Sequence, residues 1–86
     1  MRVLHLRDRA RDAIHALAPR GSPDRPALMQ VLRELMDERV PLVGPGDRAL
    51  RHGSTIMGRP VPGSALLVCY VPAGDELFLV NVIRGF

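Results

Sequence analysis

Two apolar runs near the end of the chain constrain its fold more than any other feature. They are Ala65–Val71 and Leu77–Ile83, separated by the sequence Pro-Ala-Gly-Asp-Glu. A Pro-X-Gly turn between two β-rich runs is typical of an antiparallel hairpin. Successive residues of both runs are apolar, so both faces of each strand are expected to be covered. The pattern therefore predicts two central strands of a small sheet.

The length of the chain limits what can cover those two faces. Eighty-six residues make one domain, spanning 1–86, because a second hydrophobic core would not fit. Helices from the N-terminal half can cover only one face of the hairpin. The other face predicts either a partner molecule, such as a second copy, or a long loop folded across it.

Two amphipathic helices are predicted after a short strand over Met1–Leu6. Asp8 is placed to cap a first helix over Arg9–Ala18, and Asp24 is placed to cap a second. The apolar stripe of the second helix has the spacing of one helical face: Leu28, Val31, Leu32, Leu35 and Met36. This helix should stop at Val40, because the following proline disfavours helical geometry. A short connection predicts an antiparallel helical hairpin.

The segment Pro41–Gly63 is rich in proline and glycine. It predicts a loop, a short strand near Ser54–Met57 and a turn over Gly58–Gly63. The predicted fold class is α+β, with the N-terminal strand and helical hairpin packed on a small antiparallel sheet in the order β-α-α-β-β-β.

The charged residues favour an anionic partner. The net charge is +3, the isoelectric point is near 10.4, and every basic residue is arginine. Guanidinium groups are planar forks that suit phosphate or carboxylate, so nucleic acid or an acidic protein is the expected partner.

The only cysteine, Cys69, excludes an internal disulfide and is expected to be a buried, inert thiol. No metal and no other cofactor is expected, because His5, His15, His52 and Cys69 lack the spacing of a ligand set. The longest apolar run has seven residues, against about 20 for a membrane span. Met1–Leu6 is too short for the apolar part of a signal peptide, so we expect a cytoplasmic protein without a membrane partner.

Three features together resemble the RelE/ParE superfamily of bacterial type II toxins. They are the arginine-rich helix start Arg7–Ile14 after a short strand, the segment Gly58–Gly63, and the closing hairpin Leu66–Arg84. The resemblance covers nearly the whole chain. It implies a toxin that is held inactive by a cognate antitoxin. RelE-like members cleave mRNA on the ribosome, whereas ParE-like members bind DNA gyrase.

The resemblance implies a set of site residues. Arg59 precedes the hairpin, where such nucleases keep basic residues, and Arg84 lies near their phosphate-binding arginine. His52 is the loop histidine that could act as a general base. The catalytic candidates are therefore His52, Arg59 and Arg84, and the RNA- or phosphate-binding candidates are Arg48, Arg51, Arg59 and Arg84.

The chain also departs from the nuclease pattern, which weighs against ribonuclease activity. Ser64, Ala65 and Leu66 stand where a nuclease-type arginine is expected, and Phe86 comes before the tail that supplies a terminal tyrosine or histidine. Arg59 could instead be a solvated loop charge, and Arg84 could merely solvate a strand end.

Two other interpretations remain open at this stage. The chain could be a non-catalytic α+β interaction module that forms a homodimer through its sheet. It could also be a small arginine-rich RNA-binding protein. The lack of aromatic residues near the basic loop argues against the second of these interpretations, because single-stranded RNA is usually bound by stacking.

Overall fold

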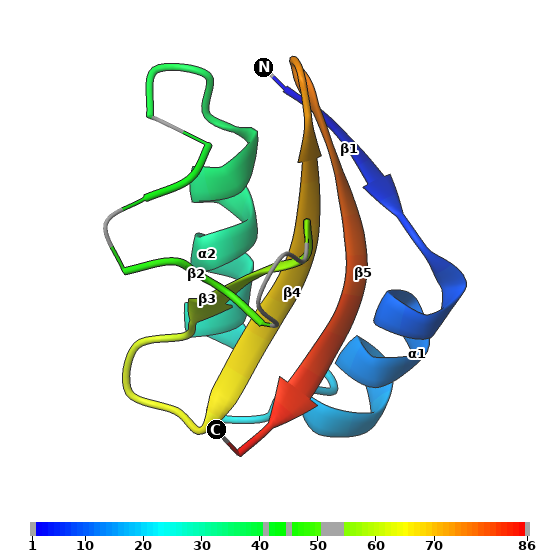
Figure 1. The fold of residues 1–86 in the computed structure, drawn as a ribbon. Helices are drawn as coiled ribbons and strands as arrows, with labels where there is room; N and C mark the ends of the chain where they lie inside the picture. The colour runs from blue at the N-terminus through cyan, green and yellow to red at the C-terminus, as the bar shows by residue number, and fades with distance from the viewer. Residues whose placement is uncertain (1, 41, 45, 51–54, 86) are drawn as a thin grey trace.

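A five-stranded sheet with two helices forms the protein (Figure 1). The structure is a computed structural model, and it describes residues 2–40, 42–44, 46–50 and 55–85. The elements are β1 (Val3–Leu6), α1 (Asp8–Leu17), α2 (Arg25–Met36), β2 (Arg48–Ala49), β3 (Met57–Pro60), β4 (Leu66–Ala73) and β5 (Glu76–Arg84). Among these elements, no helix is long and apolar enough to cross a membrane.

The strands lie in the order β1-β5-β4-β3-β2, which confirms the α+β class and places the predicted hairpin near the centre of the sheet. The sheet is mixed rather than wholly antiparallel. The N-terminal strand pairs in parallel with β5, with Leu4 opposite Leu77, and all other neighbours are antiparallel. Parallel pairing requires a crossover connection between the two strands. Here the connection from β1 to β5 contains both helices and the strands β2, β3 and β4.

The hairpin of β4 and β5 contains one irregularity that matters for the surface. Tyr70 lies opposite Leu79 and Cys69 lies opposite Asn81, so Val80 is an extra residue without a partner in β4. Such a bulge changes the direction of the strand and re-aims its side chains. The turn of the hairpin contains Gly74 at a φ of 63°, a conformation that glycine adopts without strain.

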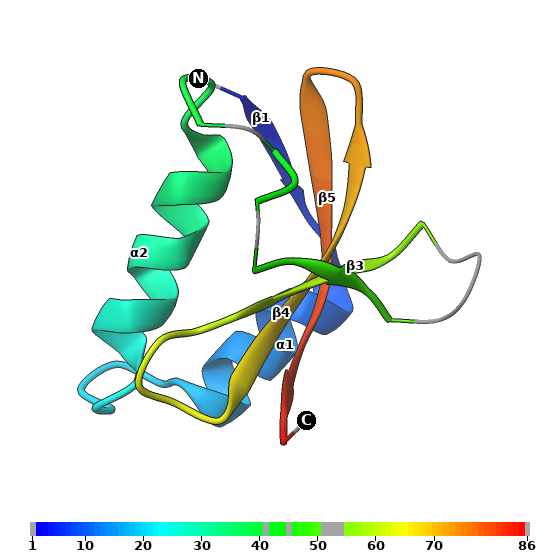
Figure 2. The same cartoon turned by 60° about the vertical axis from the view of Figure 1, so that its left-hand side comes forward.

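The hydrophobic core lies between the helices and one face of the sheet. The helices contribute buried Ile14 and Leu28, among others, while alternate residues of β4 and β5 face them. These alternate residues are Leu66, Val68, Tyr70, Leu77, Leu79 and Val82. We call this side of the sheet the helix side. Figure 2 shows α2 to the left of the strands and β3 crossing in front of β4.

The segment before the hairpin differs from the sequence prediction. Gly58–Pro60 belong to β3 rather than to a turn, and a further strand, β2, pairs with β3. The predicted strand near Ser54–Met57 overlaps β3 only at Met57, and residues 51–54 lie outside the described part. The helices begin near the predicted caps, at Asp8 and after Asp24, but neither N-cap makes a side-chain hydrogen bond.

Candidate functional site

The side of the sheet away from the helices carries a second, less covered apolar surface. We call it the open face. It comprises Leu67, Cys69 and Val71 of β4, Phe78, Val80, Asn81 and Ile83 of β5, and Leu50 and Ile56 beside β3. Leu50 and Ile56 are 37% and 36% exposed. The expectation that helices would cover only one face of the hairpin is therefore confirmed, with Leu50 and Ile56 giving partial cover to the other face.

A hollow of about 260 Å³ lies on the open face, and Cys69 forms part of its lining. Its walls are mainly apolar, from Leu50, Ile56, Val80 and Ile83, with Arg9 and Asn81 as the polar groups. The bulge in β5 explains why Val80 and its neighbour Asn81 both reach this hollow.

Gly58 allows Leu50 to form a wall of this hollow. A Cβ atom added at Gly58 would lie 2.7 Å from Cδ2 of Leu50 and 3.0 Å from Cδ2 of Leu67. Because Gly58 has no side chain, the side chain of Leu50 can pack directly against β3 at this position. Gly58 is the register partner of Arg48, and directly opposite residues of antiparallel strands point to the same face. This pairing places Arg48 on the open-face side.

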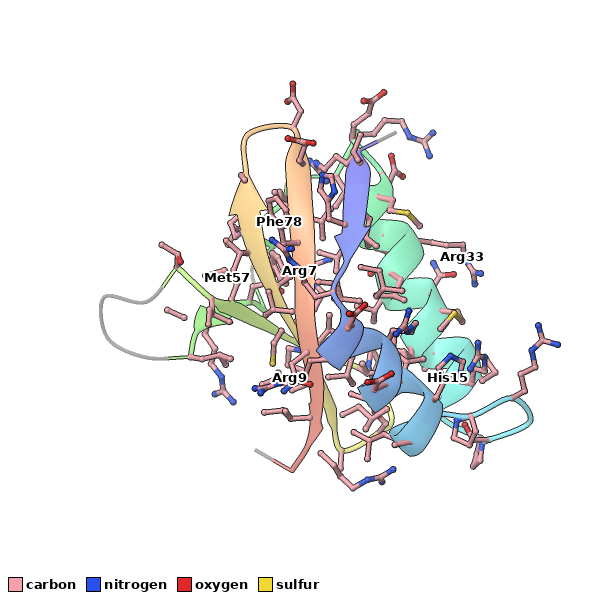
Figure 3. The ribbon with its side chains drawn as sticks, turned by 90° about the vertical axis from the view of Figure 1, so that its right-hand side faces the viewer. Arg7, Arg9, His15, Arg33, Met57 and Phe78 are labelled. Carbon is pink, nitrogen blue, oxygen red and sulfur yellow. The ribbon has the colours of Figure 1, made fainter. Side chains whose placement is uncertain are left out.

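A ring cluster lies at the β1 edge of the open face (Figure 3). Parallel pairing puts His5 opposite Phe78, and the two rings stack at 4.6 Å between centroids with an interplanar angle of 16°. The guanidinium of Arg7 lies 4.9 Å from the centroid of the Phe78 ring. Nε2 of His5 lies 2.8 Å from Oε1 of Glu76, which orients the imidazole. This cluster combines a cation with a stacked pair of rings.

The open face carries cations at both ends. Arg7 and Arg9 approach from the junction of β1 and α1, while Arg48 lies on β2 at the other end. All three residues are exposed. Guanidinium forks around a partly apolar surface can hold phosphate or carboxylate groups of a large ligand whose other parts are apolar or aromatic.

Arg59, predicted to be catalytic and phosphate-binding, lies on the helix side of β3. Its guanidinium donates two hydrogen bonds of 2.8 Å to Asp47, one from Nε to Oδ1 and one to Oδ2. The side chain of Arg59 is 11% exposed and that of Asp47 only 1%. Oδ2 of Asp47 also accepts hydrogen bonds from the Tyr70 hydroxyl and from the Gly44 amide. In this buried cluster, the guanidinium of Arg59 is hydrogen-bonded to groups of the protein itself.

The other predicted site residues do not gather at one place. Arg84 is exposed and donates a hydrogen bond of 3.2 Å to the carbonyl of Leu17, the last residue of α1. This contact places a cation at a helix C-terminus, where it is favourable. Arg51 and His52 lie outside the described residues. Arg48 therefore lies on the open-face side, whereas Arg59 and Arg84 contact groups on the helix side.

Cys69 and His15 contribute little to the chemistry of the open face, because the thiol of Cys69 is buried and His15 lies away from this face. Cys69 is 3% exposed, and burial raises the pKa of its thiol. His15 projects from α1 away from the ring cluster of the open face (Figure 3). In the described part of the chain, no three His, Cys, Asp or Glu side chains are grouped so that they could hold a metal ion.

His5, Arg7, Arg9 and Phe78 are not among the site residues predicted from the sequence. One signal could have found three of them. His5 and Arg7 alternate with apolar residues and so share one face of an extended strand, and the strand Leu77–Ile83 presents Phe78 on one face. The sequence pattern does not show that β1 pairs in parallel with β5. This pairing brings together residues far apart in the chain, such as His5 and Glu76, which are 71 positions apart.

Comparison with known proteins gives structural matches only. No protein-family model matches the sequence, and no curated protein matches it significantly. Two similar solved structures are a copper-bound mutant toxin and a metal-bound toxin, both from Helicobacter pylori, with TM-scores of 0.73 each and identities of 22% and 21%. A solution structure of a conserved hypothetical protein from the same organism has a TM-score of 0.66 at 21% identity. Each match covers 98% of this chain and 94% of the other, so the whole fold is shared.

Proposed function

We propose that this chain is the toxin of a type II toxin–antitoxin pair of the RelE/ParE kind. It acts by binding a macromolecular target through the open face, and a cognate antitoxin neutralises it. The observation that carries the proposal is the agreement of the whole fold with two Helicobacter pylori toxin structures. The cationic rim around an apolar hollow supports the role of the open face, because a large anionic partner needs both features.

The chemistry of the open face suits either target class implied by the family resemblance. Arg7, Arg9 and Arg48 could bind phosphates of mRNA on the ribosome, or acidic side chains on DNA gyrase. We expect binding without cleavage. The two arginines that the family resemblance makes catalytic, Arg59 and Arg84, contact Asp47 and the Leu17 carbonyl instead, and Ser64, Ala65 and Leu66 stand where a further nuclease-type arginine is expected.

Growth of a bacterial host tests the proposal. Induced expression of the chain should halt growth, and co-expression of a small adjacent gene encoding the antitoxin should restore it. Normal growth at a high level of soluble protein would contradict the proposal.

Primer extension on translated message tests the expected absence of mRNA cleavage. Extension products should be the same with and without the protein. New stops within codons, present only when the protein is expressed, would show that the chain is a nuclease.

A second candidate function is a non-catalytic interaction module that forms a homodimer through the sheet. The exposure of Leu50 and Ile56 beside half-buried Val80 and Ile83 favours it, because an apolar surface of this kind is typical of protein interfaces. The growth experiment separates the two functions, since a dimerising module without a cellular target leaves growth unchanged.

A further inference from the structure

The cluster of Asp47, Arg59 and Tyr70 joins the segment before β2 to the central strands. From the described residues, the carboxylate of Asp47 accepts four hydrogen bonds: two from Arg59 of β3, one from the Tyr70 hydroxyl of β4 and one from the Gly44 amide. The carbonyl of Leu42 lies 3.1 Å from NH2 of Arg59 and 3.0 Å from the Tyr70 hydroxyl. Side-chain hydrogen bonds thus attach Leu42 and Asp47 to the sheet.

This fastening point lies directly before the part of the chain that reaches the open face. Asp47 is followed by β2, which has only two residues and two register partners, Gly58 and Met57. Leu50 comes next, and its amide donates a 3.0 Å hydrogen bond to the carbonyl of Ile56. So short a strand has little stability of its own. The buried ion pair of Asp47 with Arg59 directly precedes β2 and adds a fixed point beside it.

We propose that Asp47, Arg59 and Tyr70 form a latch on the helix side that positions Arg48 and Leu50 on the open face. The carboxylate and the guanidinium both point toward the helix side, while the residues they position lie on the opposite side of β2 and β3. A buried ion pair selects one arrangement of its surroundings, because any other arrangement leaves a charge without its partner. In this role Arg59 is a positioning residue and does not contact the target.

The Asp47→Asn variant tests the latch, because it preserves side-chain volume and removes the carboxylate charge. Tyr70→Phe is the milder test, because it removes the hydroxyl contacts with Asp47 and the Leu42 carbonyl but keeps the ring and the ion pair. The measurement is amide hydrogen exchange, comparing the Leu50 amide with core amides of β4 and β5 in the same sample. We expect exchange at Leu50 to rise at least tenfold in Asp47→Asn, and by less in Tyr70→Phe, while the core amides change far less.

Ile14→Val is the control, because it weakens the helix-side core at α1 without altering the latch. At a comparable loss of global stability, this variant should leave the Leu50 amide protected relative to the core amides. Unchanged relative protection of Leu50 in both latch variants would overturn the proposal. Equal acceleration in the Ile14→Val control would overturn it as well.

The functional arm of the test rests on the proposed toxin function. At equal soluble expression, Asp47→Asn should lose growth arrest while Ile14→Val keeps it. Faster exchange at Leu50 with full growth arrest would show that the position of this segment does not matter for the site. If the unaltered chain fails to arrest growth, the toxin proposal fails, and the exchange measurement still decides whether the latch exists.

Discussion

Asp47 has an unusual setting for a carboxylate, since its side chain is almost fully buried beside a single guanidinium. Burial alone would raise the pKa of Asp47, but the hydrogen bonds from Arg59, Tyr70 and Gly44 outweigh it, and the pKa is lowered. Glu34 of α2 is the other acidic group near Arg59. A lowered pKa means that the ionised carboxylate stabilises the folded state.

This lowered pKa predicts a pH dependence of stability. Ionised Asp47 contributes stability above the pKa of the unfolded chain, which is about 4. That contribution is lost as the pH falls through the lower pKa of the folded state. Urea unfolding at a series of pH values should show the free energy of unfolding falling more steeply below pH of about 4 in the unaltered chain than in Asp47→Asn. Parallel curves for the two proteins would contradict the assignment.

Cys69 offers a chemical probe of the hollow on the open face. The thiol is buried, and burial raises its pKa, so little reactive thiolate is accessible. A thiol reagent at a pH of about 8 should therefore label the native protein slowly. Leu50→Ala removes one wall of the hollow and should speed labelling severalfold, whereas the control Val3→Ala, at an exposed position of β1, should not. Rapid labelling of the unaltered protein would show that the hollow does not shield Cys69.

The roles of single residues were the part of the site least accessible to sequence reasoning. Arg59 was a sound candidate by residue type and position, yet its role depends on Asp47, which lies 12 residues earlier. The sequence contains many arginines and several acids, and no spacing rule pairs these two. His5 and Phe78 come together only through the parallel pairing of the two strands.

At the scale of elements, β4 is the strand on which the core depends most. Val68 is fully buried in the middle of the strand, between Arg59 of β3 and Val82 of β5 in the sheet register. Val68→Asp should abolish soluble folding, because an unpaired buried charge costs several kcal/mol against a total stability of about 5–15 kcal/mol. Soluble yield and circular dichroism check this outcome. Val71→Asp is the matched control, because its half-exposed site on the open face lets the carboxylate reach water.

The hairpin and the helices were predictable because their signals are local. A Pro-X-Gly turn and two apolar runs define β4 and β5, and the apolar stripe defines α2. The strands before the hairpin were not predictable in the same way, since the two residues of β2 are too few to show a periodic pattern. Gly58 was assigned to a turn from its residue type. In the structure it belongs to β3, where the absence of a side chain makes room for Leu50.

For the whole molecule, the open face predicts association. Leu50 and Ile56 are exposed and lie beside half-buried Val80 and Ile83, so a partner on this face would bury further apolar surface. Sedimentation of the purified chain should show concentration-dependent self-association or a stable complex with the proposed antitoxin. Ile56→Asp should weaken the association, whereas Val43→Asp, at an exposed position outside the open face, should not. A monodisperse monomer at high concentration that also fails to bind the antitoxin would show that the open face is not a partner surface.

We expect that the cations of the open face, rather than positive charge in general, carry the proposed function. The most direct test compares growth arrest by two charge-matched double variants at equal soluble expression. Arg7→Ala with Arg9→Ala removes two cations beside the open face, and Arg20→Ala with Arg33→Ala removes two exposed cations from the helical half (Figure 3 shows Arg7, Arg9 and Arg33). The first pair should abolish growth arrest, and the second pair should preserve it. Equal loss in both pairs, or full arrest by the first pair, would contradict it.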